Sequence, residues 1–174
     1  MRPFHLEHAA LHCDVRQLLL QARQKARHQI DTTVVQAYWG VGCRIVEDEQ
    51  GGQKRAQYGG RVLQWLSGKL TQEFGSGYDV TNLRSMRRFY LAFPIRDTLS
   101  LELGWSSYRL LSRIENPQAR DWYAQESAEQ GWSVRALDRQ IATLYYERLL
   151  STQDQSKALV KTEAAQQIAK DAPP

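Results

Sequence analysis

The chain has 174 residues, 42% of them hydrophobic, with five tryptophans. This composition excludes a disordered chain and suits one domain with its own core. The formal net charge is +4, and the 17 arginines outnumber the six lysines. Because arginine binds phosphates and guanine edges through a planar fork, the bias favours nucleic acid, with a solvated basic surface as the alternative. The N-terminus lacks the apolar core of a signal peptide and no run approaches about 18 apolar residues, so we expect a soluble, cytoplasmic protein without membrane contact.

The first 51 residues have helical periodicity. One apolar stripe predicts a helix over about residues 7–30, and its members are Leu11, Val15, Leu18, Leu19, Ala22, Ala26 and Ile30. A second stripe follows with Val34, Tyr38, Val41 and Ile45. Asp31 and Thr32 either interrupt the helix between the stripes or lie on its solvated side. The pair Gly51-Gly52 predicts the end of the second stripe.

Residues 61–92 give the clearest local pattern. A first helix is predicted over 61–74, and glycines follow at 75 and 77. Asp79 suits an N-cap, while Tyr78 and Leu83 have the spacing of a hydrophobic staple. The apolar positions that share one face of the second helix, over 80–92, are Leu83, Met86, Tyr90 and Phe93. Two helices joined by a short glycine turn predict a helix–turn–helix motif over about 61–92.

The remaining chain predicts further helices. Residues 95–103 have partial strand alternation and form either a short wing strand or a loop. Helices are expected after Ser106, from Asn116-Pro117 to about Gln130, and after Ser133. Residues 151–174 are polar and predict a weakly helical linker or tail with little to bury. The fold class is therefore all-α: a helix–turn–helix or winged-helix-like domain over residues 1–150, with a C-terminal helical extension.

The second helix of the motif presents a face suited to DNA. No acidic residue occurs between Thr81 and Arg96 to pair with its arginines, which favours a nucleic-acid surface over a solvated ion-paired one. Arg84 and Arg88 are expected to reach bases or phosphates, and Arg87 to grip a phosphate or to pack. The full set of candidate DNA-binding residues is Thr81, Asn82, Arg84, Ser85, Arg87, Arg88, Lys69, Lys54 and Arg55.

The sequence offers no catalytic, cofactor or metal site. His5, His8 and His12 could share one helical face, but they lie near a terminus where helices fray, so we expect no metal there. Gly68-Lys69 is followed by leucine, which excludes a Walker phosphate loop. No aspartate or glutamate is followed two residues later by lysine, so the carboxylate-x-lysine element of metal-dependent nucleases is missing from this chain.

The chain resembles the N-terminal domain of the YhcG family over about residues 14–150. The motifs that carry the resemblance are Tyr38-Trp39-x-x-Gly42-x-x-Ile45-Val46, Tyr58-Gly59, Asn82-Leu83-Arg84-x-Met86-Arg87-x-Phe89-Tyr90, and the stretches 105–123 and 131–141. The resemblance implies a DNA-binding, winged-helix-like module that a PD-(D/E)xK nuclease domain normally follows. Because this chain lacks the E-x-K element, the resemblance assigns no nuclease residue here and implies a C-terminal nuclease domain as partner.

These observations predict a DNA-binding module that targets a linked or partner nuclease to double-stranded DNA and is not itself an enzyme. The alternative is a helical protein-interaction domain without DNA readout. In that case the segments Trp105–Tyr123 and Trp132–Leu150 would form a homodimer or dock another subunit, since tryptophan and tyrosine suit interfaces as well as cores.

Overall fold

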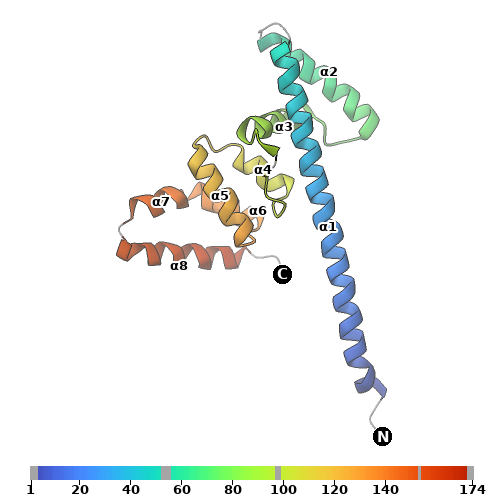
Figure 1. The fold of residues 1–174 in the computed structure, drawn as a ribbon, viewed down its shortest axis with the longest axis vertical. Helices are drawn as coiled ribbons and strands as arrows, with labels where there is room; N and C mark the ends of the chain where they lie inside the picture. The colour runs from blue at the N-terminus through green and yellow to red at the C-terminus, as the bar shows by residue number, and fades with distance from the viewer. Residues whose placement is uncertain (1–3, 52–55, 97–98, 153, 172–174) are drawn as a thin grey trace.

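A computed structural model describes residues 4–51, 56–96, 99–152 and 154–171, and within these ranges the regular structure is helical, with no strand. The helices are α1 (Phe4–Gly51), α2 (Ala56–Phe74), α3 (Val80–Ala92), α4 (Trp105–Leu111), α5 (Pro117–Glu129), α6 (Val134–Ala142), α7 (Tyr145–Ser151) and α8 (Asp154–Lys170). The predicted all-α class is confirmed. Figure 1 shows a long α1 with α2 and α3 near its C-terminal end and α4 to α8 beside its middle.

The two predicted N-terminal stripes belong to one 48-residue helix, α1. Asp31 and Thr32 do not interrupt it. The Thr32 hydroxyl donates to the carbonyl of His28 (3.0 Å), and the Thr33 hydroxyl donates to that of Gln29 (2.8 Å). Because both hydroxyls bond back to the preceding turn, these residues are accommodated without a break. The last described residue of this helix is Gly51, the first of the glycine pair.

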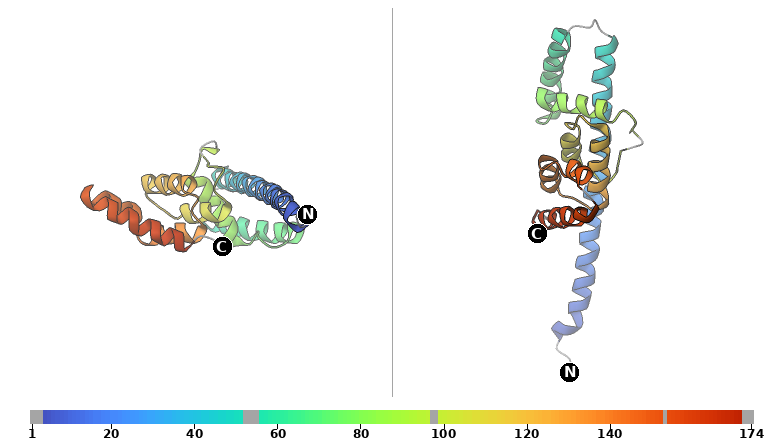
Figure 2. Two further views of the ribbon diagram at one scale, coloured as in Figure 1. Left: turned by 90° about the horizontal axis from the view of Figure 1, so that it is seen from below. Right: turned by 90° about the vertical axis from the view of Figure 1, so that its left-hand side faces the viewer.

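The helices α1, α2 and α3 share one small core. Its buried members are Ile45 of α1, Leu63 of α2, and Leu83 and Met86 of α3. Figure 2 shows α2 running back alongside α1, with α3 lying across both. The close approach of α1 and α3 depends on Gly42, since a Cβ there would lie 2.2 Å from the Met86 carbonyl oxygen.

The larger core joins the end of α3 to the C-terminal helices. It contains the fully buried rings of Phe89, Tyr108 and Tyr123, together with Leu111 and Leu137. The Tyr123 hydroxyl donates to the carbonyl of Gln140 (3.1 Å) and accepts from the backbone N–H of Tyr146 (3.0 Å). This single side chain therefore fastens α5 to α6 and α7.

Three boundaries differ from the sequence-based expectation. The cap of α4 is Gly104, because the helix already begins at Trp105 and Ser106 lies inside it. The helix predicted after Ser133 is divided into α6 and α7 by Leu144, whose φ of 53° is left-handed. No strand occurs among residues 95, 96 and 99–103, so this described part contains no wing strand.

The C-terminal segment packs more than its polar composition suggests. Ala164 of α8 is buried, and Ile168 contacts the larger core. Arg139 of α6 forms an ion pair with Asp171 (3.2 Å), whose side chain is nearly buried. Ser133 donates its hydroxyl to the Asp171 carbonyl (3.0 Å). The division into a domain of residues 1–150 and a tail of 151–174 stays a prediction, but α8 is attached to the domain.

Candidate nucleic-acid interface

The start of α3 is fixed by its own sequence. Asp79 adopts the extended N-cap conformation, and its carboxylate accepts from the backbone N–H groups of Thr81 (2.8 Å) and Asn82 (3.1 Å). Tyr78 and Leu83 both belong to the small core, which agrees with the predicted staple. The helix therefore begins at Val80 in a defined orientation, and this determines which side chains face outward.

One face of α3 is committed to the interior. Its buried residues are Leu83, Met86 and Phe89, and Phe93 is buried just beyond the helix. The sequence-based core face included Tyr90 and left out Phe89. Tyr90 is only half-buried and stacks edge-on against Trp39 at 5.1 Å between ring centroids. Phe89 could have been identified from its four-residue spacing to Phe93.

The opposite face of α3 is open to solvent. Thr81, Arg84, Arg88 and Leu91 are exposed and recur at three- and four-residue spacing. Among the described residues, no ion pair involves Arg84 or Arg88. Their guanidinium groups therefore remain able to bind an external anion.

Arg87 differs from its two neighbours because it has an acidic partner in α1. Its Nε donates to Oε2 of Glu49 at 2.6 Å, and both side chains are partly buried. The absence of acids between residues 81 and 96 made Arg87 a candidate phosphate contact. The fold supplies an acid from 38 residues earlier in the chain. The Nε of Arg87 is thus already engaged in an ion pair within the protein, and its part in DNA binding stays a prediction.

Asn82 and Ser85 use their polar groups inside the protein. The Asn82 side-chain amide donates to the carbonyl of Gly77, which holds the turn between α2 and α3. The Ser85 hydroxyl donates to the Thr81 carbonyl (3.0 Å). The half-buried Asn82 is therefore a turn-stabilising residue in this structure, and Ser85 offers mainly its acceptor lone pairs to the surface.

Of the remaining sequence-based candidates, Lys69 alone lies within the described residues. Lys69 is exposed on α2. With 3.6 residues per turn, it lies about 120° around α2 from Leu63, which packs towards α3. Its side chain thus lies to one side of the packed face of α2. Lys54 and Arg55 lie outside the described residues, so their predicted role has no structural counterpart here.

A basic hollow of about 550 Å³ adjoins the C-terminal end of the α3 face. Its lining residues are Arg88, Leu91, Ala92, Ser112, Arg113, Ile114, Glu115 and Arg120. Arg120 is held in place, because its Nη1 donates to the Ile114 carbonyl (3.2 Å) and its guanidinium lies 5.4 Å from the centre of the Phe93 ring. Its buried Nε has no hydrogen-bond partner within the described structure. Three arginines around one hollow can bind a phosphate group.

No other chemistry is apparent in the described part of the chain. No group of three His, Cys, Asp or Glu side chains there could hold a metal ion. His8 and His12 lie on α1, and the side chain of His5 is outside the described set. None of the helices, searched over the described residues, is long and apolar enough to cross a membrane.

Comparison with known proteins places the chain in a family. Residues 14–148 match the family described as the DUF1016 N-terminal domain. The chain belongs to this family. It is also 35% identical, over 181 aligned positions, to a protein of Escherichia coli (strain K12) named "Putative nuclease YhcG". The resemblance of the motifs to the YhcG family is thereby confirmed.

The alignment covers different shares of the two proteins. It includes 86% of this chain but only 48% of the Escherichia coli protein, so the chain spans about half the length of that relative. No solved structure matches the chain.

Proposed function

We propose that this DUF1016 N-terminal domain binds duplex DNA through α3 and directs a linked nuclease domain to it. The observation that carries the proposal is the exposed face of α3, where Arg84 and Arg88 have no acidic partner among the described residues. The nuclease-named relative, which is about twice as long as the matched region, supports a linked catalytic domain.

The arrangement of α2 and α3 suggests how docking would occur. In helix–turn–helix proteins the N-terminal residues of the second helix contact base edges. Thr81 and Arg84 occupy this part of α3. Arg88 lies further along, beside the hollow that Arg113 and Arg120 also line. We therefore assign base contacts to Thr81 and Arg84 and phosphate contacts to the three arginines of the hollow.

A titration of duplex DNA tests the proposal. Fluorescence anisotropy with a labelled mixed-sequence duplex at about 0.1 M salt should show binding by the 174-residue chain. The double variant Arg84→Ala/Arg88→Ala should bind at least about tenfold more weakly, because each charge-assisted hydrogen bond contributes about 1.5–3 kcal/mol. The matched control is Arg44→Ala/Arg148→Ala, which removes two positive charges from α1 and α7. Equal losses in both variants would contradict the proposal.

Cleavage would belong to the linked domain. The chain contains no carboxylate-x-lysine element, so we expect it to leave duplex DNA intact in a nuclease assay with magnesium. Magnesium-dependent cleavage that co-purifies with the chain through successive columns would overturn this assignment.

The alternative function is a protein-interaction domain. The sequence suggested it through the tryptophans after residue 104, whereas in the structure the exposed Trp65 favours it. Trp132 is buried, and Trp105 and Trp122 are half-buried against other aromatic rings of the cores. The tryptophans of the segments 105–123 and 132–150 therefore pack mainly inside the protein. Trp65 of α2, in contrast, is 64% exposed. Light scattering with and without duplex DNA separates the two functions, since assembly without DNA binding would favour interaction.

A further inference from the structure

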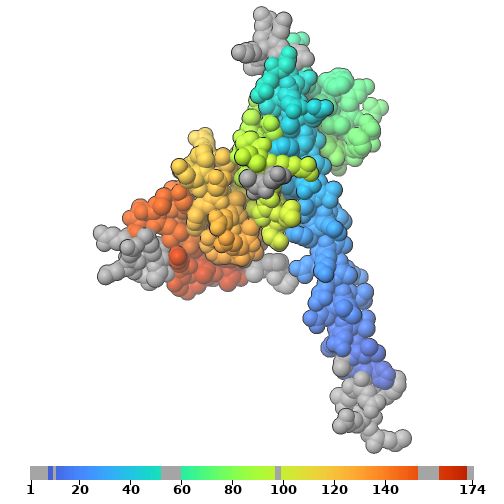
Figure 3. Space-filling view, viewed as in Figure 1, coloured from blue at the N-terminus to red at the C-terminus, as the bar shows by residue number. Residues whose placement is uncertain are grey.

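The first part of α1 stands clear of the rest of the molecule up to the half-buried His28, whose Nε2 lies 4.0 Å from a carboxylate oxygen of Glu102. We call residues 11–30 the arm. Every side chain from 11 to 27 is exposed, and the first buried side chain described in the chain is Val35. Figure 3 shows the arm extending away from the other helices. Since most helical stability in proteins comes from tertiary packing, a helix of this length without packing is unusual.

The arm exposes an apolar stripe. Its members are Leu11, Val15, Leu18, Leu19, Ala22, Ala26 and Ile30, at three- and four-residue spacing. Leu18 is 65% exposed and Ile30 is 63% exposed. Contiguous exposed apolar surface of this kind marks an interaction site. Leu20 is also exposed, but at 3.6 residues per turn it lies about 160° around the helix from Leu18.

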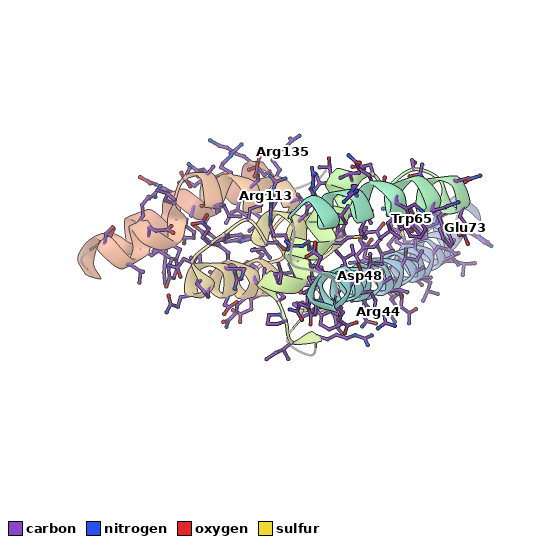
Figure 4. The ribbon with its side chains drawn as sticks, turned by 90° about the horizontal axis from the view of Figure 1, so that it is seen from above. Arg44, Asp48, Trp65, Glu73, Arg113 and Arg135 are labelled. Carbon is purple, nitrogen blue, oxygen red and sulfur yellow. The ribbon has the colours of Figure 1, made fainter. Side chains whose placement is uncertain are left out.

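An apolar groove of about 870 Å³ lies between α1 and α2. Its lining includes Ala37, Gly40 and Val41 from α1, and Trp65, Leu66 and Leu70 from α2. Figure 4 labels Trp65 on α2 and Arg44 and Asp48 on α1, which come from the two sides of the groove. A Cβ at Gly40 would have no atom within 4 Å, so the floor of the groove is open.

The stripe and the groove lie on one side of α1. At 3.6 residues per turn, Ala37 lies within about 20° of Ile30 around the helix, and Gly40 has the same direction as Ala22. Gly42, which touches α3, points to another side, so a helix docked along the stripe would avoid the α1–α3 contact. The arm cannot fold back into its own groove, because α1 is one continuous helix through Gly51.

The charges of the arm and the groove are complementary. The arm carries Arg16, Arg23, Lys25 and Arg27 against the single acid Asp14. The groove is lined by Glu47 and Asp48 with one base, Arg44, which already pairs with Glu47 at 2.9 Å. Asp48 has no ion pair among the described residues. In an antiparallel pair of α1 helices centred near residue 30, Arg16 of the second arm would lie within about one helical turn of Asp48, and the other three bases would face residues 33–37. A basic, apolar helix is thus the kind of segment that this groove fits, and the arm of another molecule is such a helix.

We propose that the groove of each chain holds the arm of a second copy, in an antiparallel dimer. The stripe spans residues 11–30 of α1, and the α1 residues that line the groove lie between 37 and 48. The midpoint of these two segments along the helix falls near residue 30. A two-fold axis there inserts both arms at once and brings Ile30 against its own counterpart, as a closed isologous interface requires. This proposal is independent of DNA binding.

Sedimentation velocity on the full chain tests the dimer. The chain should sediment as a dimer, and Leu18→Glu should raise the dissociation constant at least tenfold. The matched control Leu20→Glu adds the same charge to another exposed leucine and should leave the dimer unchanged. Circular dichroism confirms that both variants keep their helices. A chain that is monomeric at every concentration, or equal effects of the two variants, would overturn the proposal.

Spin-label distances test the antiparallel register. In a Cys13→Ser/Cys43→Ser background, one nitroxide is placed at Gln29→Cys or at Gln17→Cys, both exposed positions. With a rise of 1.5 Å per residue and helix axes about 9 Å apart, the distance between the two labels of an antiparallel dimer should be about 30 Å longer at position 17 than at position 29. Similar distances at both positions indicate a parallel dimer and would contradict the proposal.

Discussion

Gly42 sets the distance between α1 and α3, the two helices that position the candidate interface. A side chain at this position would collide with the backbone of Met86, which cannot move as a flexible side chain could. Trp39, three residues earlier, donates its indole N–H to the Phe93 carbonyl at 2.7 Å and fixes the far end of the same contact. Together these residues hold α3 with its arginine face outward.

We expect Gly42→Ala to lower the free energy of unfolding by about 1–3 kcal/mol, because the added methyl group forces the helices apart. The control is Gly68→Ala in α2, where nothing lies within 4 Å of the added Cβ. There the substitution should stabilise the helix by about 0.5–1 kcal/mol. Urea denaturation measures both changes, and a Gly42→Ala variant as stable as Gly68→Ala would refute the packing argument.

A second residue-scale prediction separates Arg87 from Arg88. Arg87 is engaged by Glu49, whereas Arg88 is exposed beside the basic hollow. Arg88→Ala should therefore weaken duplex binding several-fold more than Arg87→Ala, while Arg87→Ala should cost more stability. Anisotropy titrations and urea denaturation of the two single variants give the comparison, and the reverse order of affinities would contradict the assignment.

At the scale of elements, buried tyrosines tie the short C-terminal helices together. Burial raises the pKa of Tyr108 and of Tyr123 to about 12, from an ordinary value of 10.0. Between pH 10 and 12 the unfolded chain loses tyrosine protons that the folded chain retains. The stability that depends on these groups is thus fully present below pH 10 and is lost as the pH rises towards 12.

We therefore expect the unfolding free energy to fall with increasing pH above about 10. Tyr123→Phe should make this decline shallower. At neutral pH the same variant should lose about 1–2 kcal/mol, because the backbone N–H of Tyr146 loses its acceptor. Urea denaturation at several pH values between 8 and 11 measures both effects. An identical pH dependence in the two proteins would be evidence against a buried, protonated Tyr123.

Sequence patterns predicted the helices and their caps more completely than the contacts between helices. The caps at Asp79, Asn116 and Ser133 were predictable because each accepts hydrogen bonds from backbone N–H groups two or three residues on. The pairing of Arg87 with Glu49 was not, because it joins residues 38 positions apart whose proximity arises only from the α1–α3 packing. Leu144 gave no local signal either, since its left-handed conformation is unusual for a leucine.

At the scale of the whole molecule, the arm is separate from the cores that stabilise one chain. A chain that starts at residue 31 should retain its fold, because the buried side chains described here begin at Val35. Its unfolding free energy at low protein concentration should stay within about 0.5 kcal/mol of the full chain. It should also be monomeric in sedimentation velocity. A truncated chain that unfolds or still dimerises would show that the arm has a different role.

The salt dependence of duplex binding tests the central claim, DNA docking by the arginine face of α3, most directly. Each phosphate contact contributes about 0.9 to the slope of log affinity against log salt concentration. For Arg84→Ala/Arg88→Ala we predict a weaker affinity and a slope shallower by about one, because Arg88 is the phosphate contact of this pair. The control Arg44→Ala/Arg148→Ala should keep the original slope. An affinity and a salt slope unchanged by the loss of Arg84 and Arg88 would contradict the account.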